Sequence, residues 1–430
     1  MKKLITFLGT GFYDKCIYTF EHIESRETHF IQTAIYEVLK EHGEEIDELY
    51  LFLTPKAKEG NFTTGNVSRL DGKKYEGLKT VWEQYFPTEQ NKLIVVDIEH
   101  DQSEAKLWEL FEQIFDIIDE NDELYIDITH SFRSIPLVSL IIANYAKTIK
   151  NAKIKKLLYG NFEQLDKTTN KAPIVDITSM ANLLDWTTSV ESFLRTGNPT
   201  QIQQLTKERL AQNFKDVELK EINRLTDKLV ELNENMVTSR GTTFEPVLQE
   251  IDHILQDVKD ITSSKLPQMT KLFEKIEQKM ELFEGNTYER MWGAIKWCVE
   301  HELYQQAFTF AREFMITIVV DQLTHLEEVQ NIKKQKERRA LRDDVSAMIF
   351  HCVNPNVNIK RTSLRYPTIY DPVIEIVHNN LDHFKVYDTI VDYRNNINHA
   401  GYEQNELKFS RLEHKSKNIV EAIKPLFFQS

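Results

Sequence analysis

A change of pattern near residue 185 constrains the fold of this 430-residue chain more than any other feature of its sequence. Up to about residue 180, short β-rich apolar runs alternate with longer windows that carry apolar residues at three- and four-residue spacing. Beyond that point the strand signal all but disappears, and helical windows follow one another toward the C-terminus. The pattern predicts an α/β domain followed by an all-α region.

The alternation in the first part is that of βαβ units. Near-continuous apolar strands joined by helices indicate a mostly parallel, Rossmann-like sheet that is covered on both faces and wound right-handedly. Strands are expected over 4–8, 48–53, 92–97, 123–128, 153–159 and 174–177. Helices are expected between them over 28–42, 66–86, 104–118 and 134–150.

The sequence pattern beyond residue 180 predicts a series of helices and one clear loop. The expected helices are 183–195, 199–213, 217–237, 244–261, 266–283, 288–300, 303–329, 333–351, 372–381, 384–396 and 406–427. The segment 352–367, rich in asparagine and proline, is the clearest loop.

Composition limits the classes of function. The chain has 67 acidic and 53 basic residues and a net charge of -14, which excludes a uniformly basic nucleic-acid-binding coat, so any such contact must be local. Cys16, Cys298 and Cys352 are too few and too far apart for a disulfide framework or a Cys-x-x-Cys clamp. No stretch approaches the roughly 18 apolar residues of a membrane span. A soluble, cytoplasmic protein is therefore expected.

Two loops at strand ends are candidates for a ligand site, because ligands of open α/β sheets bind beyond the carboxyl ends of the strands. The loop after the first predicted strand holds Gly9, Thr10 and Gly11, whose glycines allow close approach of backbone N–H groups. Four polar residues follow the fourth predicted strand: Thr129, His130, Ser131 and Arg133. A helix N-terminus with an arginine beside it can bind phosphate.

The same loops have a plainer interpretation as a turn and a helix N-cap. The second loop places hydroxyl, imidazole and guanidinium groups within five residues, from Thr129 to Arg133. A helix N-cap needs only one such polar group, so this clustering favours a binding role. Neither G-x-G-x-x-G nor Gly-Lys-Ser/Thr occurs, so dinucleotide redox chemistry and P-loop hydrolysis lack support.

A candidate catalytic group lies near the end of the predicted helix 384–396. Arg394 and His399 are five residues apart, about 500° around a helix, and could converge on one phosphate. Histidine suits proton transfer in RNA cleavage by a 2′-hydroxyl, and arginine can stabilise the charge on phosphorus. The side chain of Asn395 could orient both Arg394 and His399. Alternatively, His399 is favoured at a helix end by the macrodipole and Arg394 is a solvated surface residue.

The segment 331–366 is locally basic, with nine Lys or Arg residues against three acids. It could attract a single-stranded nucleic-acid backbone, with Tyr366 and Tyr370 stacking on bases, or it could be a solvated helix face. No metal site is expected, since His378 and His383 lack an obvious carboxylate or cysteine set and no His-Glu-x-x-His occurs.

In this order the motifs resemble a known family, the CRISPR-associated ribonucleases with an N-terminal CARF domain and a C-terminal HEPN domain, activated by cyclic oligoadenylate in type III CRISPR defence. The resemblance rests on three motifs: residues 7–11 with Tyr13, Cys16 and Tyr18; residues 127–134; and Arg394-Asn395 followed by His399. The last matches the HEPN pattern of Arg, a polar residue, three variable residues and His.

The resemblance implies a CARF sensor over 1–180, a helical scaffold over 181–330 and a HEPN core over 331–430, with 181–430 as one all-α unit. The activator, expected to be cyclic tetra-adenylate, would bind through Gly9, Thr10 and Gly11 and through the four residues of the second loop. No cofactor and no metal are implied.

The implied activity is metal-independent endoribonuclease cleavage of single-stranded RNA, leaving a 2′,3′-cyclic phosphate. Both sites would be shared across a homodimer, which fits a symmetric ring on a two-fold axis. Two alternatives remain open: a non-catalytic regulator that senses cyclic oligonucleotides, and an enzyme that degrades cyclic oligoadenylate.

Overall fold

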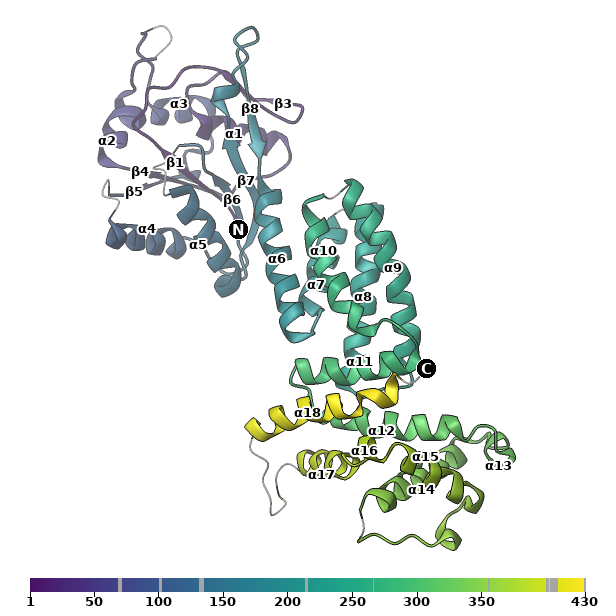
Figure 1. Cartoon of the computed structure of the whole chain (residues 1–430). Helices are drawn as coiled ribbons and strands as arrows, with labels where there is room; N and C mark the ends of the chain where they lie inside the picture. The colour runs from purple at the N-terminus through teal and green to yellow at the C-terminus, as the bar shows by residue number, and fades with distance from the viewer. Residues whose placement is uncertain are drawn as a thin grey trace. The chain divides into compact units, whose positions relative to one another are not determined.

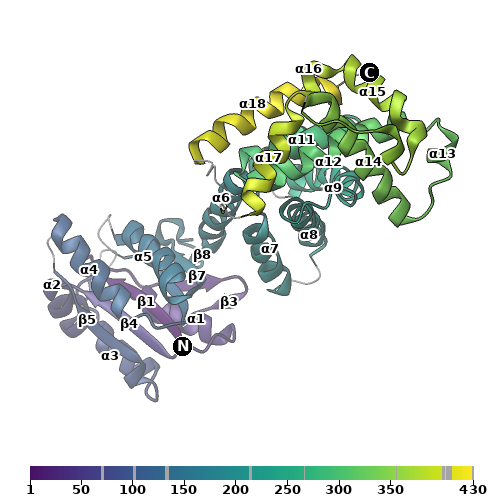
Figure 2. The ribbon, with the colours of Figure 1, turned by 90° about the horizontal axis from the view of Figure 1, so that it is seen from below.

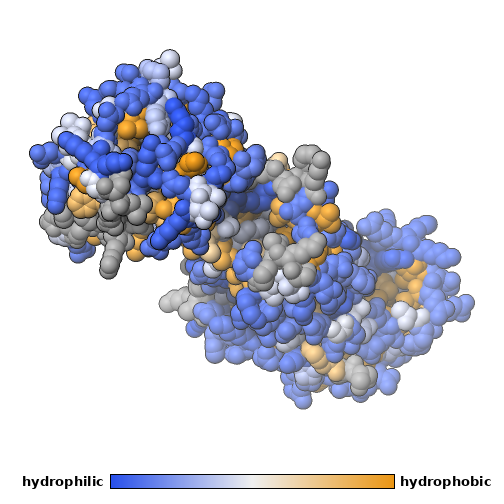
Figure 3. Space-filling view, turned by 90° about the horizontal axis from the view of Figure 1, so that it is seen from above, coloured by the Kyte–Doolittle hydropathy of each residue, from blue (hydrophilic) through white to orange (hydrophobic). Residues whose placement is uncertain are grey.

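The computed structural model describes residues 1–68, 72–99, 103–130, 135–212, 216–265, 267–354, 356–399, 402 and 409–428. The chain divides into two compact units, Met1–Leu184 and Asp185–Ser430 (Figure 1). No helix in the described part of the chain is long and apolar enough to cross a membrane. The surface seen in Figure 3 is mostly hydrophilic, with hydrophobic residues in small groups.

The N-terminal unit is built on an eight-stranded sheet in the order β3-β2-β8-β7-β6-β1-β4-β5. The strands are β1 (Lys2–Leu8), β2 (Ile17–Phe20), β3 (Ile23–Glu24), β4 (Glu48–Leu53), β5 (Leu93–Asp97), β6 (Glu123–Asp127), β7 (Lys153–Gly160) and β8 (Lys171–Asp176). All pairs from β5 through β4, β1 and β6 to β7 are parallel. β8 runs antiparallel to β7, β2 is parallel to β8, and β3 is antiparallel to β2.

Helices cover both faces of this sheet. They are α1 (Ile31–Glu41), α2 (Pro55–Ala57), α3 (Leu78–Tyr85), α4 (Glu104–Asp116), α5 (Ile135–Lys150) and α6 (Thr178–Thr196), with a π-helical segment η1 (Lys58–Thr64) and short 3₁₀ segments η2 (Gln90–Lys92) and η3 (Phe162–Gln164). Leu4 and Leu8 of β1 join a core with α1 and α3, and Ile5 and Phe7 join a second core with α4 and α5. The two-faced burial explains why the strands are apolar throughout.

The predicted fold class is confirmed, and each of the six predicted strands is present. β2 and β3 were not predicted, because strands of four and two residues are too short to show a period. The predicted helix 66–86 is wrong in its first half. Val67 and Lys74 form an antiparallel bridge and Gly72 has φ +68°, so α3 begins only at Leu78; residues 69–71 of the predicted helix lie outside the described part of the chain.

The C-terminal unit is helical, as predicted. Its helices are α7 (Thr200–Gln212), α8 (Val217–Val237), α9 (Phe244–Lys265), α10 (Pro267–Met280), α11 (Thr287–Glu300), α12 (Tyr304–Gln322), α13 (Glu327–Gln330), α14 (Gln335–Val353), α15 (Tyr370–Asn379), α16 (Leu381–Phe384), α17 (Tyr387–Asn398) and α18 (Phe409–Phe427), with 3₁₀ segments η4 (Glu281–Phe283), η5 (Arg361–Ser363) and η6 (Pro367–Ile369). α12 packs against α11, α14, α17 and α18 (Figure 2).

The predicted helix 303–329 is two helices, because the chain turns after Gln322. The Thr324 hydroxyl donates to the carbonyl oxygen of Asp321, and the His325 ring bonds the carbonyl oxygen of Gln322. Such side-chain bonds compete with the helical ones.

Candidate ligand pocket and candidate nuclease site

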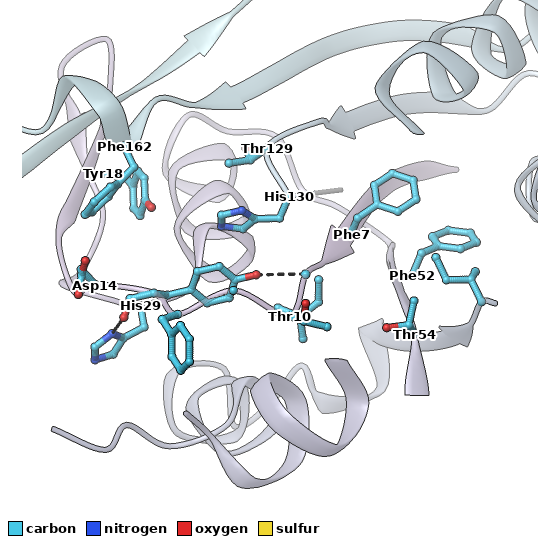
Figure 4. Close-up of a pocket in the computed structure, with 16 residues that line it drawn as sticks. Phe7, Thr10, Asp14, Tyr18, His29, Phe52, Thr54, Thr129, His130 and Phe162 are labelled. Carbon is cyan, nitrogen blue, oxygen red and sulfur yellow. Dashed lines mark hydrogen bonds between the residues drawn. The ribbon is translucent and has the colours of Figure 1, made fainter. Parts of the chain in front are cut away.

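A cavity of about 420 Å³ opens beyond the carboxyl ends of β1, β4 and β6 in the N-terminal unit (Figure 4). The chain continues from β1 to β4 and β5 on one side and to β6 and β7 on the other, so the cavity lies at the topological switch point. It is lined by Phe7, Leu8, Gly9, Thr10, Gly11, Phe12, Tyr13, Asp14, Tyr18, His29, Phe52, Thr54, Ile98, Thr129, His130 and Phe162. It brings together five of the predicted ligand residues; the other two, Ser131 and Arg133, lie outside the described residues.

The loop after β1 is held by Asn61, a buried residue of η1. The Asn61 side-chain amide donates to the carbonyl oxygens of Gly9 and Gly11, both at 2.8 Å. Its own oxygen accepts from the Tyr75 hydroxyl at 3.0 Å, and that hydroxyl accepts from the Tyr13 N–H at 3.1 Å. The sequence analysis missed Asn61 because no local signal marks a residue that acts on a loop 50 positions away.

Tyr13 turns back over the same loop. Its hydroxyl accepts from the Gly9 N–H at 3.1 Å, and its ring stacks on His130 with the ring centres 4.4 Å apart. A Cβ atom at Gly9 would lie 3.0 Å from the Tyr13 hydroxyl, so a side chain there would displace it. Burial lowers the pKa of His130 to about 4, so the imidazole that stacks on Tyr13 is uncharged at neutral pH.

Thr129 is tied into the sheet at the end of β6. Its hydroxyl donates to the buried Asp127 carboxylate at 2.5 Å and accepts from the Gly160 N–H at 2.8 Å. Asp127 also accepts from the Thr6 hydroxyl at 2.5 Å, and burial raises the pKa of this carboxyl. The Thr129 hydroxyl therefore keeps one acceptor lone pair for a ligand.

The walls of the cavity are aromatic and nearly uncharged. Its described lining includes the rings of Phe12, Tyr18 and Phe162, with Phe12 half-exposed, and it includes Asp14 but no lysine or arginine. Such rings suit stacking of nucleobases. Within the described part of the lining, the hydrogen-bond donors for an anionic group are backbone N–H groups and the exposed hydroxyl of Thr10.

In the C-terminal unit, Arg394 and Asn395 lie in the last turns of α17 and His399 follows as its C-cap residue. The His399 N–H donates to the Asn395 carbonyl oxygen at 2.9 Å, and the His399 side chain is exposed. α12 fixes this end of α17: the Gln305 amide donates to Asn398 Oδ1 at 3.3 Å.

Arg394 has no ion pair among the described residues, and its Nε–H is buried without an acceptor. Arg312 and Arg342 in the same unit both pair with Glu313. A buried donor without a partner is costly, so this Nε–H is a polar group that the described part of the fold does not satisfy.

The basic segment differs in part from the prediction. Tyr366 is buried and its hydroxyl donates to the Glu337 carbonyl oxygen, so it cannot stack on a base. The guanidinium of Arg361 pairs with Asp371 and lies 5.9 Å from the ring centre of Tyr370. Five cations around the start of α14 are exposed: Lys333, Lys334, Lys336, Arg338 and Arg339.

Within the described residues, no group of three or more His, Cys, Asp or Glu side chains could hold a metal ion. His378 and His383 each bond a backbone carbonyl oxygen.

Comparisons with known proteins bear on both units. Residues 3–164 match the family model for the CARF domain of the CRISPR system endoribonuclease Csx1. Residues 182–283 match the model for the second domain of CRISPR-associated protein MJ1674. The protein of that name from Methanocaldococcus jannaschii is 27% identical over 281 residues, which cover 63% of this chain and 41% of the relative, so the chain spans about two-fifths of the relative's length.

A solved structure of Enterococcus italicus Csm6 bound to cyclic hexa-2′-fluoro-hexa-dAMP covers 99% of this chain and 93% of its own, with 11% identity and a TM-score of 0.47. The family models and the curated relative support a CRISPR-associated protein with an N-terminal CARF domain. Arg394, Asn395 and His399 lie outside both regions that the family models match.

Proposed function

We propose that this CRISPR-associated CARF protein is an endoribonuclease that cleaves single-stranded RNA without a metal when a cyclic oligoadenylate occupies the pocket of the N-terminal unit. The proposal is carried by the pocket at Gly9–Gly11, which lies within the region that matches the CARF domain of an endoribonuclease. It is supported by Arg394, which has no ion pair among the described residues and stands five positions before His399 at the end of α17.

A cyclic oligoadenylate suits the pocket because it combines flat bases with anionic linkages. The aromatic lining offers stacking surfaces for the adenines. We assign the phosphates to the N–H groups of Thr10 and Gly11 and to the side chains of Thr10 and Arg133, since the Gly9 N–H already donates to Tyr13. The uncharged His130 imidazole is left to hydrogen-bond a base or a ribose hydroxyl.

At the second site, we assign proton transfer to His399 and charge stabilisation to Arg394. The 2′-hydroxyl oxygen forms a bond to the adjacent phosphorus while the bond from phosphorus to the 5′-oxygen breaks. The 2′-hydroxyl proton passes to a histidine, and the leaving oxygen receives one. The products are a 2′,3′-cyclic phosphate and a 5′-hydroxyl, and Arg394 stabilises the charge on the non-bridging oxygens. Asn395 is assigned to orient the substrate phosphate.

A homodimer supplies two histidines to one composite site, one to accept the proton and one to donate it, which a single His399 cannot do at once. The exposed cations at the start of α14 would attract the RNA backbone. Activation then requires that the ligand bind the active conformation more tightly than the inactive one. Raising the active fraction from 1% to 99% takes a difference of about 5.5 kcal/mol between the two binding free energies.

The test is cleavage of labelled single-stranded RNA with no activator, with cyclic tetra-adenylate and with cyclic hexa-adenylate, each with and without EDTA. We expect cleavage only with one of the rings, unchanged by EDTA, and none by His399→Ala. Full cleavage by His399→Ala would remove the nuclease assignment, and loss of activity in EDTA that Mg²⁺ or Mn²⁺ restores would indicate a metal-dependent reaction.

A further inference from the structure

The start of α14 carries a dense group of exposed cations. We call it the α14 basic surface; its members are Lys333, Lys334, Lys336, Arg338 and Arg339. Of these five, only Lys334 has an ion-pair partner in the described part of the chain, Glu337 at 4.0 Å. By contrast, the exposed Lys271 on α10 pairs with Glu274 at 2.8 Å. The chain as a whole has a net charge of -14, so this surface is a local exception.

The position of these cations opposes the stability of their own helix. α14 begins after its N-cap residue Lys334, with Lys336 in its first turn and Arg338 and Arg339 in its second. The start of a helix carries a partial positive charge, so acids stabilise this end and cations destabilise it. A run of cations that destabilises its helix is expected where the cations serve another purpose.

A loop that packs on α14 extends the basic surface. The Tyr366 hydroxyl donates to the Glu337 carbonyl oxygen at 3.3 Å, and the Tyr366 N–H donates to the Asp344 carboxylate at 2.9 Å. These two bonds hold the loop against the first turns of α14. They bring Arg365, which is exposed, to the same end of the helix.

The acids of the same region are partly used by the fold. Asp344 accepts from the Tyr366 N–H, and Glu328 on α13 accepts from the Thr368 hydroxyl. Glu327 and Asp343 are exposed. Six exposed cations, with Arg365 included, against two exposed acids leave the surface positive and suited to a polyanion.

α12 and α14 run antiparallel, which places the start of α14 near the C-terminal end of α12. The Arg342 guanidinium of α14 donates to the Thr317 hydroxyl of α12 at 3.0 Å. The Ser346 hydroxyl, one turn further along α14, accepts from Arg312 at 2.9 Å, five residues earlier in α12. The α14 basic surface precedes Arg342, so it lies beyond Thr317 toward the end of α12.

The candidate nuclease site lies at the other end of the same helix. Gln305, in the first turn of α12, bonds Asn398, which directly precedes His399. α12 has 19 residues, and at a rise of about 1.5 Å per residue its ends are roughly 25 Å apart. Figure 1 shows α17 and α13 at opposite ends of α12. One phosphate therefore cannot contact both the α14 basic surface and His399.

We propose that the α14 basic surface is a second RNA-binding site, which holds a single-stranded RNA by its phosphates while the strand is cut at Arg394 and His399. The inference rests on the proposed function and deepens it, because it sets a length for a good substrate. Phosphates of a stacked strand are about 3.4 Å apart, so a strand that spans roughly 25 Å needs about seven nucleotides. An RNA of about 20 nucleotides occupies both sites, whereas an RNA of about four nucleotides at His399 does not reach α14.

The first test is binding of a labelled, mixed-sequence RNA of about 20 nucleotides to the full-length protein without activator, by fluorescence anisotropy between about 50 and 200 mM salt. Each cation on a single strand contributes about 0.7 to the slope of log K against log salt. Joint replacement of Lys333, Lys336, Arg338 and Arg339 by glutamine should flatten this slope by up to about 3 and weaken binding at the lowest salt at least tenfold.

The matched control replaces four exposed lysines of α8, α9 and α10 by glutamine: Lys220, Lys259, Lys271 and Lys275. This control changes the net charge by the same amount and should bind the RNA within twofold of wild type. Because the helix dipole disfavours cations at the start of α14, the α14 variant should melt at the wild-type temperature or above it. A lower melting temperature would overturn the proposal, since the cations would then serve the fold.

The second test compares kcat/KM for RNA of about 20 and of about four nucleotides at saturating activator. The α14 variant should lose at least tenfold on the long RNA and keep the wild-type value on the short one. Equal losses on both would overturn the separate site. An unchanged salt slope, or tighter binding of the wild type to duplex DNA of the same length, would overturn the assignment to single-stranded RNA. The binding measurements require no cleavage, so failure of the nuclease proposal remains a distinct result.

Discussion

Asn61→Ala removes the residue that holds the glycine loop of the pocket. The substitution deletes two hydrogen bonds donated to the Gly9 and Gly11 carbonyl oxygens and one accepted from Tyr75. At a net value of about 1 kcal/mol each, the three bonds are worth roughly 3 kcal/mol. Water can replace part of this at the partly exposed loop carbonyls, so we expect about 1–2 kcal/mol to be lost from the stability of the loop.

In Asn61→Ala, a ligand that binds only the native conformation of the glycine loop must offset the stability that the loop has lost. Since about 1.4 kcal/mol corresponds to a factor of ten, Asn61→Ala should weaken binding of the activating ring about tenfold. RNA cleavage at a saturating activator concentration should stay close to wild type, because the substitution leaves the helical unit unchanged.

The assay is calorimetric titration of each ring into wild type and Asn61→Ala, with a melting curve to show that the variant is folded. Gln84→Ala is the matched control, since this exposed α3 side chain donates to Glu76 at the surface, and the variant should bind within twofold of wild type. A folded Asn61→Ala that also binds within twofold would refute the argument that this amide organises the site.

Three further predictions concern single side chains. Thr129→Val should lower the free energy of unfolding by about 1–3 kcal/mol, measured by urea denaturation, because its hydroxyl bonds within the sheet; an unchanged midpoint would contradict this. Burial lowers the pKa of His301 to about 4, so protonation favours the unfolded chain and stability should fall as pH drops from 6.5 toward 4. His301→Phe should flatten this decline in melting temperature, and an equal slope would contradict the assignment. Arg394→Ala should lose RNA cleavage at least a hundredfold without lowering the melting temperature, since it forms no ion pair in the described structure, and a clear loss of stability would show a structural role instead.

The fold was predictable where apolar periodicity is strong. β1 buries both of its faces, and α8 was predicted with its observed bounds because its apolar residues keep a regular helical spacing and Asp216 caps its start. β2 was not predictable, since its pairing with β8 joins residues about 150 positions apart and leaves no period in a four-residue strand. The break after Gln322 depends on side-chain bonds of Thr324 and His325 that a hydrophobic pattern does not register.

For the candidate sites, strand ends and helix ends could be predicted, whereas the residues that support them could not. Gly9 and His130 line one cavity because parallel strands end at the same edge of a sheet. Asn61 depends on tertiary contact alone. The alternative in which Tyr366 stacks on bases was wrong, because local charge does not show that its ring is buried.

In the proposed function, a ligand in the N-terminal unit switches on chemistry in the C-terminal unit. The most direct test of this coupling is one titration of the wild-type protein in which occupancy of the pocket by a fluorescent cyclic oligoadenylate and the initial rate of RNA cleavage are measured on the same samples. We expect no cleavage at zero ligand and a rate that rises with occupancy to a plateau. Cleavage that is already complete without ligand, or a rate that stays at zero while the pocket fills, would contradict it.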